Sequence, residues 1–245
     1  MARIEEHTEL ELESPVLVEG LPGVGLVGKI AADHLIEAFE MDHYASCYCE
    51  GLPRVAVYEG GTHTVRPPVR IYADEGRDLL VLQSDVPVSP QASPQFASCV
   101  TGWFETNDVL PICLSGLPEE KDGLPEMYGI ATGESESLLR EVDIDVPKES
   151  GMVSGPTGAL LAEATEQGVD SLGLIVQANA QFPDPEAARI LLVEGIEPLA
   201  SLDVDTEKLV EQAEDIADAR ERLAKQMQEA QEEKSSQAKP LGMYQ

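Results

Sequence analysis

The chain has 245 residues, with 46 acidic and 16 basic side chains, a formal net charge of −30 and a sequence pI near 4.2. This charge excludes nucleic acid and anionic membrane surfaces as partners, because phosphate binding needs clustered Lys and Arg. No uncharged apolar run approaches the length of about 18 residues that spans a membrane, and no apolar segment follows Met1. We therefore expect a cytoplasmic protein without a transmembrane helix or a signal peptide.

Strands and helices alternate along the first 200 residues. Apolar side chains recur every three or four residues in the predicted helices, and the run Leu79–Leu82 is typical of a strand buried on both faces. The predicted elements are, in order, strand 15–20, helix 26–39, strands 44–49, 54–59, 68–73 and 79–82, helix 93–107, strand 109–114, a helix introduced by 154–158 that ends before Gly168, strand 172–176 and helix 185–195. This alternation predicts an α/β fold, a single three-layer sandwich with a mixed or largely parallel sheet.

Residues 203–236 follow a different pattern, in which apolar positions step alternately by four and three residues. The seam consists of Leu209, Ala213, Ile216, Arg220, Leu223, Met227 and Ala230. Such a heptad-like seam predicts one helix that docks on the core domain or on a partner helix. We therefore divide the chain into an α/β core domain at 1–202, a C-terminal helix at 203–236 and a flexible tail at 237–245.

The acidic residues are spread over the core domain. Residues 1–202 contain 35 acidic and 10 basic side chains, whereas residues 203–245 contain only eleven and six. An acidic interaction tail would show the opposite distribution. Because the resulting self-repulsion is screened at molar salt, we predict adaptation to a salt-rich cytoplasm, as in a halophile. The alternative, a surface loaded with calcium, lacks the repeated Asp-x-Asp-x-Asp-Gly pattern.

Cysteine and histidine residues show no metal-binding spacing. The four cysteines are Cys47, Cys49, Cys99 and Cys113, and the four histidines are His7, His34, His43 and His63. There is no C-x-x-C pair, whereas a structural zinc site needs about four ligands in tight pairs. We therefore predict free thiols in a reducing compartment, and no metal site.

The segment 23–28 matches G-x-G-x-x-G between a strand and a helix, and Lys29 occupies the position of a P-loop lysine. However, Ile30 stands where a P-loop has the Ser or Thr that binds magnesium. The competing interpretation is a tight turn that needs glycine for positive φ and close packing, and we favour it. A nucleotide- or nucleoside-binding enzyme that uses Gly23–Lys29 remains the alternative function.

Three further residues suggest chemistry only weakly. Asp85 follows a buried strand, as magnesium-binding aspartates do, but a single Asp at this place usually caps a loop. Ser154 and Thr157 lie in a second glycine turn without a nearby histidine to activate them, which favours helix capping. We predict no catalytic residue, no cofactor and no metal.

The sequence ends in Met243-Tyr244-Gln245, a hydrophobic-Tyr-any tripeptide. An apolar Met can fill a pocket, Tyr adds packing and a hydroxyl, and a terminal carboxylate needs a cation or backbone donors. These residues either insert into a partner or form a tail that folds back or is disordered.

The run Glu19–Ala31 resembles the signature of the proteasome assembly chaperone 2 family in its archaeal branch, and Ser154–Leu161 is similar to the second glycine motif of that family. The resemblance covers roughly residues 10–200. Its structural glycine motifs comprise Gly20, Pro22, Gly23, Gly25, Gly28, Gly155 and Gly158. The resemblance implies an α/β fold related in outline to nucleoside phosphorylases without their catalysis, homo-oligomers and, in archaeal members, binding to the 20S proteasome.

Some archaeal relatives end in a hydrophobic-Tyr-any motif that docks between α-subunits of the proteasome ring, and Met243, Tyr244 and Gln245 match it position by position. The resemblance thus implies a non-enzymatic assembly chaperone or activator of the 20S proteasome that self-associates or pairs with a paralogous subunit. Other members lack the motif, so a purely structural oligomer is a third possibility. The oligomer number, and the choice between chaperone and activator, stay open.

Overall fold

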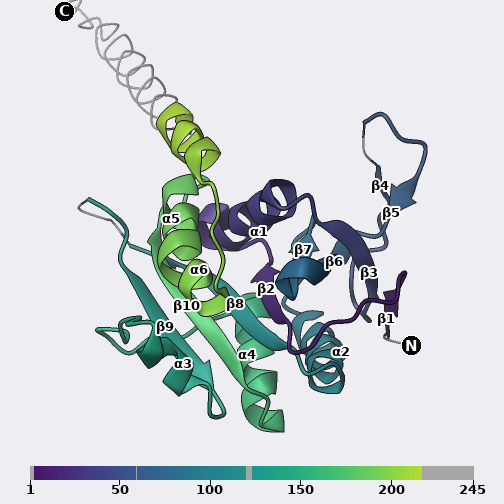
Figure 1. Ribbon diagram of the computed structural model, residues 1–245, viewed down its shortest axis with the longest axis horizontal. Coiled ribbons are helices and arrows are strands. Elements are labelled where there is room, and N and C mark those ends of the chain that lie inside the picture. The colour runs from purple at the N-terminus through teal and green to yellow at the C-terminus, as the bar shows by residue number, and fades with distance from the viewer. Residues whose placement is uncertain (1–2, 59, 120–122, 217–245) are drawn as a thin grey trace, which may run out of the picture.

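A computed structural model describes residues 3–58, 60–119 and 123–216 of the chain. A mixed eight-stranded sheet with the order β1-β3-β6-β7-β2-β8-β10-β9 forms its centre (Figure 1). The strands are β1 Arg3–Glu6, β2 Val16–Gly20, β3 Asp42–Tyr48, β6 Val69–Asp74, β7 Leu79–Ser84, β8 Leu110–Pro118, β9 Met127–Thr132 and β10 Ser171–Ala178. The four neighbours β7, β2, β8 and β10 are parallel, and the outer strands pair antiparallel.

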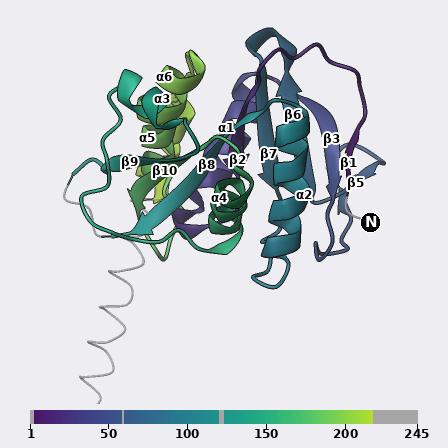
Figure 2. The same ribbon diagram turned by 90° about the horizontal axis from the view of Figure 1, so that it is seen from below.

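Helices cover both faces of this sheet, which gives the predicted three layers (Figure 2). One face carries α1 (Val27–Ala38), α5 (Pro185–Ile190), the π-helical η3 (Leu191–Ile196) and α6 (Glu197–Ala200), and the other carries α2 (Ser93–Thr106) and α4 (Gly155–Gln167). The short elements are η1 Val24–Leu26, η2 Glu75–Arg77 and α3 Glu136–Glu141, which packs beside β9. The predicted fold class is confirmed.

The apolar run in β7 reflects burial of this strand on both faces of the sheet. Leu79 and Val81 point to the face under α1, whereas Leu80 and Leu82 point to the face under α2. Since successive side chains of a strand alternate between faces, a strand covered on both sides must be apolar throughout.

The observed elements differ from the predicted ones in several places. The strand predicted at 54–59 is reduced to β4 (Val57–Tyr58), which pairs with β5 (Val65–Arg66) in a separate two-stranded sheet. The helix predicted at 185–195 begins at Pro185 with Asp184 as its cap, as expected, but continues through η3 and α6. Three of the observed elements, β1, β9 and α3, were not predicted; β1 is a largely exposed edge strand, and α3 has only six residues.

The start of the C-terminal helix lies against α1. Residues 207–216 are helical, and Leu209 is buried in the core cluster under α1. His34 Nε2 bonds with the Asp205 carbonyl at 2.6 Å, and Lys208 pairs with Glu37 of α1. Arg220, Leu223, Met227 and Ala230 of the predicted seam lie outside the described residues, as does the predicted tail at 237–245. The division of the chain at residue 202 stays a prediction.

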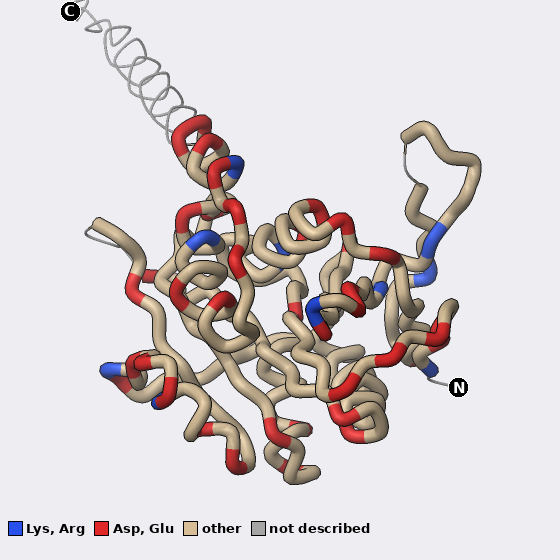
Figure 3. Tube along the Cα trace, in the orientation of Figure 1, with Lys and Arg blue, Asp and Glu red and all other residues tan. Residues whose placement is uncertain are grey.

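Acidic positions are distributed over the body of the fold (Figure 3). Lys and Arg are sparse among them, and several lie within ion pairs with neighbouring acidic residues, such as Arg140 with Glu136 and Arg189 with Glu186. The surface charge is therefore carried by the described core rather than by one segment.

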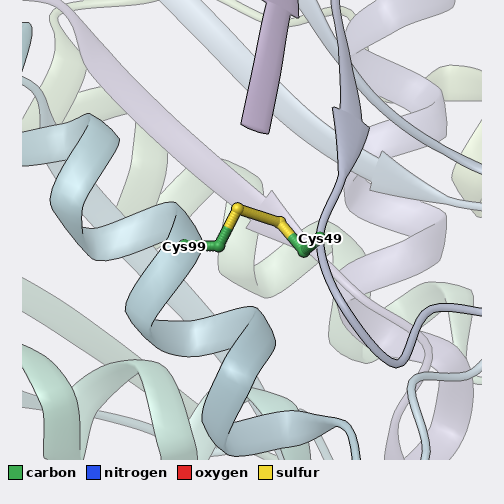
Figure 4. Close-up of a disulfide and its surroundings, with 2 residues drawn as sticks. All are labelled: Cys49 and Cys99. Carbon is green, nitrogen blue, oxygen red and sulfur yellow. A yellow bond between two sulfur atoms is a disulfide. The ribbon is translucent and has the colours of Figure 1, made fainter. Parts of the chain in front are cut away.

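Cys49, at the end of β3, and Cys99, in α2, form a disulfide (Figure 4). The expectation of four free thiols is therefore wrong for these two residues, whereas Cys47 and Cys113 are free and buried. The two bonded cysteines are 50 residues apart in sequence, with Cα atoms 6.0 Å apart. Their spacing gave no signal, because only the packing of α2 on the sheet brings them together.

Reduction of this disulfide is expected to lower the free energy of unfolding by about 2–4 kcal/mol, because the bond restricts the unfolded chain over a long loop. Urea unfolding of the oxidised protein, the reduced protein and Cys99→Ser measures the effect. The reductant should not change the stability of Cys99→Ser, which serves as the control. Equal stability of oxidised and reduced protein, with the linked peptide present in a non-reducing digest, would contradict the prediction.

Candidate functional site

A cavity of about 1020 Å³ opens at the carboxyl ends of β2, β8 and β10, three neighbouring parallel strands. Ligands of α/β proteins commonly bind at this edge of the sheet. The cavity walls come from five stretches of the chain: 21–28, 114–119, 126–130, 147–157 and 175–177. The cavity therefore lies at the edge of the sheet where α/β proteins commonly bind ligands.

The two glycine turns found separately in the sequence both line this cavity. Pro22, Gly23 and Gly28 line it from the turn after β2, and Gly155 lines it from the start of α4. Gly25 has a φ of 61°, and its carbonyl accepts a hydrogen bond from the Asp184 backbone at 2.8 Å. The fold thus joins two motifs more than a hundred residues apart into one site.

Close packing fixes two other glycines of these motifs. A Cβ atom at Gly20 would lie 2.0 Å from Ala32 Cβ, and one at Gly158 would lie 2.2 Å from the Val153 carbonyl oxygen. Neither position has room for a side chain, so β2 can approach α1 closely, and α4 can begin close to the loop before it.

The carboxyl group of Glu19, at the end of β2, is fully buried where the two glycine motifs meet. It accepts hydrogen bonds from the backbone N–H groups of Leu21 at 3.1 Å and Leu114 at 3.2 Å, and from Thr157 Oγ1 at 3.2 Å. Burial raises the pKa of Glu19 to about 8, although these three bonds oppose the shift. At neutral pH the group is therefore largely protonated, and it ties together β2, β8 and α4.

Sequence reasoning did not select Glu19 as a site residue. The available signal was a single charged residue inside the apolar strand 15–20, immediately before a glycine. Its partner Thr157 is 138 residues away. Thr157 was interpreted as a helix-capping residue, and the structure instead directs its hydroxyl to the Glu19 carboxylate.

The rim of the cavity is acidic. Among the described residues, Glu119, Glu126 and Glu149 line it together with one cation, Lys148. The Lys148 ammonium pairs with Glu126 at 2.6 Å, and this contact holds the pKa of the Glu126 carboxyl below its ordinary value. The rim therefore disfavours a phosphate-bearing ligand.

The remaining candidate residues lie elsewhere. Lys29 pairs with Asp33, one turn further along α1, rather than with the glycine turn. Asp85 forms an ion pair with the buried Arg70 at 2.7 Å and accepts a hydrogen bond from Gln83 Nε2 at 2.9 Å. The Ser154 side chain makes no capping hydrogen bond at the start of α4. Met243, Tyr244 and Gln245 lie outside the described residues.

Fold and site together define a single-domain α/β protein in which two glycine turns, joined by a hydrogen bond between Thr157 and the buried Glu19, line one cavity. The model of the PAC2 family matches residues 17–224, and this chain belongs to that family. The resemblance inferred from the glycine motifs is therefore confirmed at the level of the family.

Relatives agree with this assignment. The uncharacterized protein MJ0106 of Methanocaldococcus jannaschii is 31% identical over 224 residues, which cover 90% of both chains. The crystal structure of PbaA of Pyrococcus furiosus, an archaeal homolog of proteasome-assembly chaperone, has a TM-score of 0.76 at 27% identity and covers 96% of this chain and 97% of its own. PbaB of the same organism, an archaeal proteasome activator, shares the fold with a TM-score of 0.75 at 23% identity, covering 91% of this chain and 98% of its own.

Proposed function

We propose that this chain is a non-enzymatic proteasome-interacting protein, an assembly chaperone or activator of the 20S proteasome. The observation that carries the proposal is membership of the PAC2 family over residues 17–224, and the likeness to PbaA over almost the whole of both chains supports it. Met243, Tyr244 and Gln245 are the docking residues, and their partner is a pocket in the proteasome α-ring. The active form is an oligomer of this chain or of this chain with a paralogous subunit.

Binding through several copies of a short tail explains how such a small motif suffices. A single Met-Tyr-Gln tail has only two large side chains to bury, so its own affinity is weak. Linking several tails in one oligomer raises the apparent affinity by about 10²–10⁴. Because the chain carries a net charge of −30, its association with another acidic, salt-adapted protein strengthens as salt screens the repulsion. This suits the salt-rich cytoplasm of a halophile.

The decisive experiment is the peptidase activity and binding of a matched 20S proteasome at molar salt, with the intact protein, Tyr244→Ala and Gln245→Ala. Tyr244→Ala is expected to weaken binding about 30-fold or more, because a buried Tyr at an interface contributes about 2 kcal/mol. Gln245→Ala is the matched control, since the last position of the motif accepts any residue.

The outcomes separate the two roles. Stimulation that is lost in Tyr244→Ala and kept in Gln245→Ala supports an activator that opens the ring. Binding without stimulation supports an assembly chaperone. If neither the intact protein nor the variants bind, the proposal is wrong.

The alternative of a nucleotide- or nucleoside-binding enzyme is disfavoured by the site. Lys29 is paired with Asp33, and the rim of the cavity beside Gly23–Gly28 is acidic. A phosphate group would therefore meet carboxylates rather than a free lysine at this turn.

A further inference from the structure

The β4–β5 hairpin, with its flanking residues 53–56 and 67, forms an arm that projects from the body of the fold (Figure 1). Tyr58 and Val65 pair across its two strands, and their exposed fractions are 80% and 66%. Val55, at the base, is 47% exposed. A two-stranded ribbon of this size is at best marginally stable in water. Contact of its exposed apolar side chains with another surface would stabilise it.

The charge of the arm is opposite to that of the whole chain. Residues 53–67 contain two basic side chains, Arg54 and Arg66, and one acidic side chain, Glu59, whereas acidic positions dominate the body (Figure 3). In a chain with a net charge of −30, this combination of apolar and basic side chains fits an acidic, partly apolar surface.

The cavity at the other half of the sheet has these properties. Met152 lines it with an exposed fraction of 92%, and Val146, which precedes the lining residue Pro147, is 74% exposed. Its deeper wall includes apolar side chains such as Leu117 and Ile130, and its rim carries the three glutamates described above. Apolar walls inside an acidic rim are complementary to the arm.

The arm and the cavity belong to opposite halves of the molecule. The arm emerges beside β3 and β6, whereas the cavity lies between β2 and the β8-β10-β9 half of the sheet, and Figures 1 and 2 agree that the arm points away from β9. A second copy of the chain brings another arm to the cavity without any bending of the sheet.

We propose that the arm of one copy docks in the cavity of a second copy. Tyr58 and Val65 cover Met152 and the apolar wall, and Arg54 lies near the rim glutamates. Because arm and cavity are different surfaces, the contact is head-to-tail, and repeated contacts close into a ring or continue as a filament. The inference rests on the self-association in the proposed function and is independent of the proteasome role.

The test is the molar mass of the full chain in solution at molar salt, measured by light scattering after size-exclusion chromatography. The wild-type protein is expected to be an oligomer, and Tyr58→Asp and Met152→Asp are each expected to give the 26.4 kDa monomer. Both side chains are highly exposed, so neither substitution should disturb folding. Val210→Asp is the matched control, since Val210 is also exposed, at 41%, but lies on neither surface and should keep the wild-type mass.

Mixing the two variants identifies the pairing itself. Tyr58→Asp retains an intact cavity and Met152→Asp retains an intact arm, so an equimolar mixture can form one good contact and is expected to give a heterodimer that grows no further. A wild-type monomer, wild-type mass in either variant, or a mixture that stays monomeric would overturn the proposal. A small molecule or the chain's own tail in the cavity would produce one of these results. Loss of proteasome binding by Tyr244→Ala would leave these masses unchanged.

Discussion

Replacing Gly20 with alanine is expected to lower the free energy of unfolding by about 3 kcal/mol, a large fraction of the stability of an ordinary domain. The added Cβ would lie 2.0 Å from Ala32 Cβ and 2.8 Å from the Gly28 carbonyl oxygen. Both neighbours belong to α1, which packs on the central strand β2, so relief requires the helix to move as a whole. Overpacking of a dense core typically costs about 1–3 kcal/mol, and contacts with backbone atoms place this site at the upper end.

Gly23→Ala is the matched control within the same turn. Gly23 has an extended backbone with φ of −142°, and no atom lies within 4 Å of the position that its Cβ would occupy. We expect a change of less than about 0.5 kcal/mol, as for most exposed substitutions. Urea unfolding of both variants at constant molar salt provides the comparison. Equal stabilities would show that α1 does not approach β2 at Gly20 as closely as described.

This pair of variants also distinguishes two roles of the glycine turn, phosphate binding and close packing. If the turn existed to cradle a phosphate, Gly23, which lines the cavity, would matter for function, whereas Gly20 would matter little. If the turn serves packing, Gly20→Ala should lower the free energy of unfolding more than Gly23→Ala does. Urea unfolding of the two variants therefore tests whether Gly20, at the start of the family signature, is needed for the fold.

The sequence predicted those elements whose pattern is set by local burial. The apolar stripes of α1 and α2 each reflect one buried face, and the continuous apolar run in β7 reflects two. The predicted positions of these elements agree with the structure within a few residues. The Asp184 cap of α5 was likewise visible, because capping chemistry depends only on residues within one turn. The α/β class with a mixed or largely parallel sheet followed from the alternation of these elements, whereas the strand order was not predicted.

What the sequence did not predict depends on contacts between distant segments. Cys49 meets Cys99 only after α2 has packed on the sheet, and Glu19 meets Thr157 only after the second glycine turn has reached the first. β1 adds to an edge of the sheet with largely exposed side chains, so its pairing with β3 leaves no apolar alternation to detect. The cavity likewise exists only where two separate turns face each other.

The free energy of unfolding is expected to fall as the pH rises from about 5 to about 8, because of Glu19. Burial raises the pKa of this group from 4.5 to about 8 in the folded state, whereas in the unfolded chain it keeps its ordinary value. Between these values the folded protein holds a proton that the unfolded chain has released. Its contribution to stability is therefore complete below a pH of about 4.5 and is lost as the pH rises through about 8, a total change of about 5 kcal/mol.

Glu19→Gln removes the titrating proton, so it isolates the contribution of Glu19 to the pH dependence of the free energy of unfolding. The amide has one oxygen and an NH₂ group in place of two oxygens, so one of the backbone donors, Leu21 or Leu114, loses its acceptor. We therefore expect an offset of about 1–3 kcal/mol at low pH together with a flatter pH dependence. Urea unfolding of the wild type and the variant from a pH of about 5 to about 9, at fixed molar salt, gives the difference between the two curves.

Taking this difference removes the other titrating groups, since both proteins share them. The penalty of Glu19→Gln should shrink as the pH rises and change sign at a pH of about 5–7, because the wild type then loses about 1.4 kcal/mol per pH unit by holding a proton that the unfolded chain has released. Parallel curves would mean that Glu19 is ionised in the folded protein as it is in the unfolded chain, and hence that water or a ligand reaches it through the cavity. In that case the group at the meeting point of the two glycine turns would be a binding residue rather than a neutral link between β2, β8 and α4.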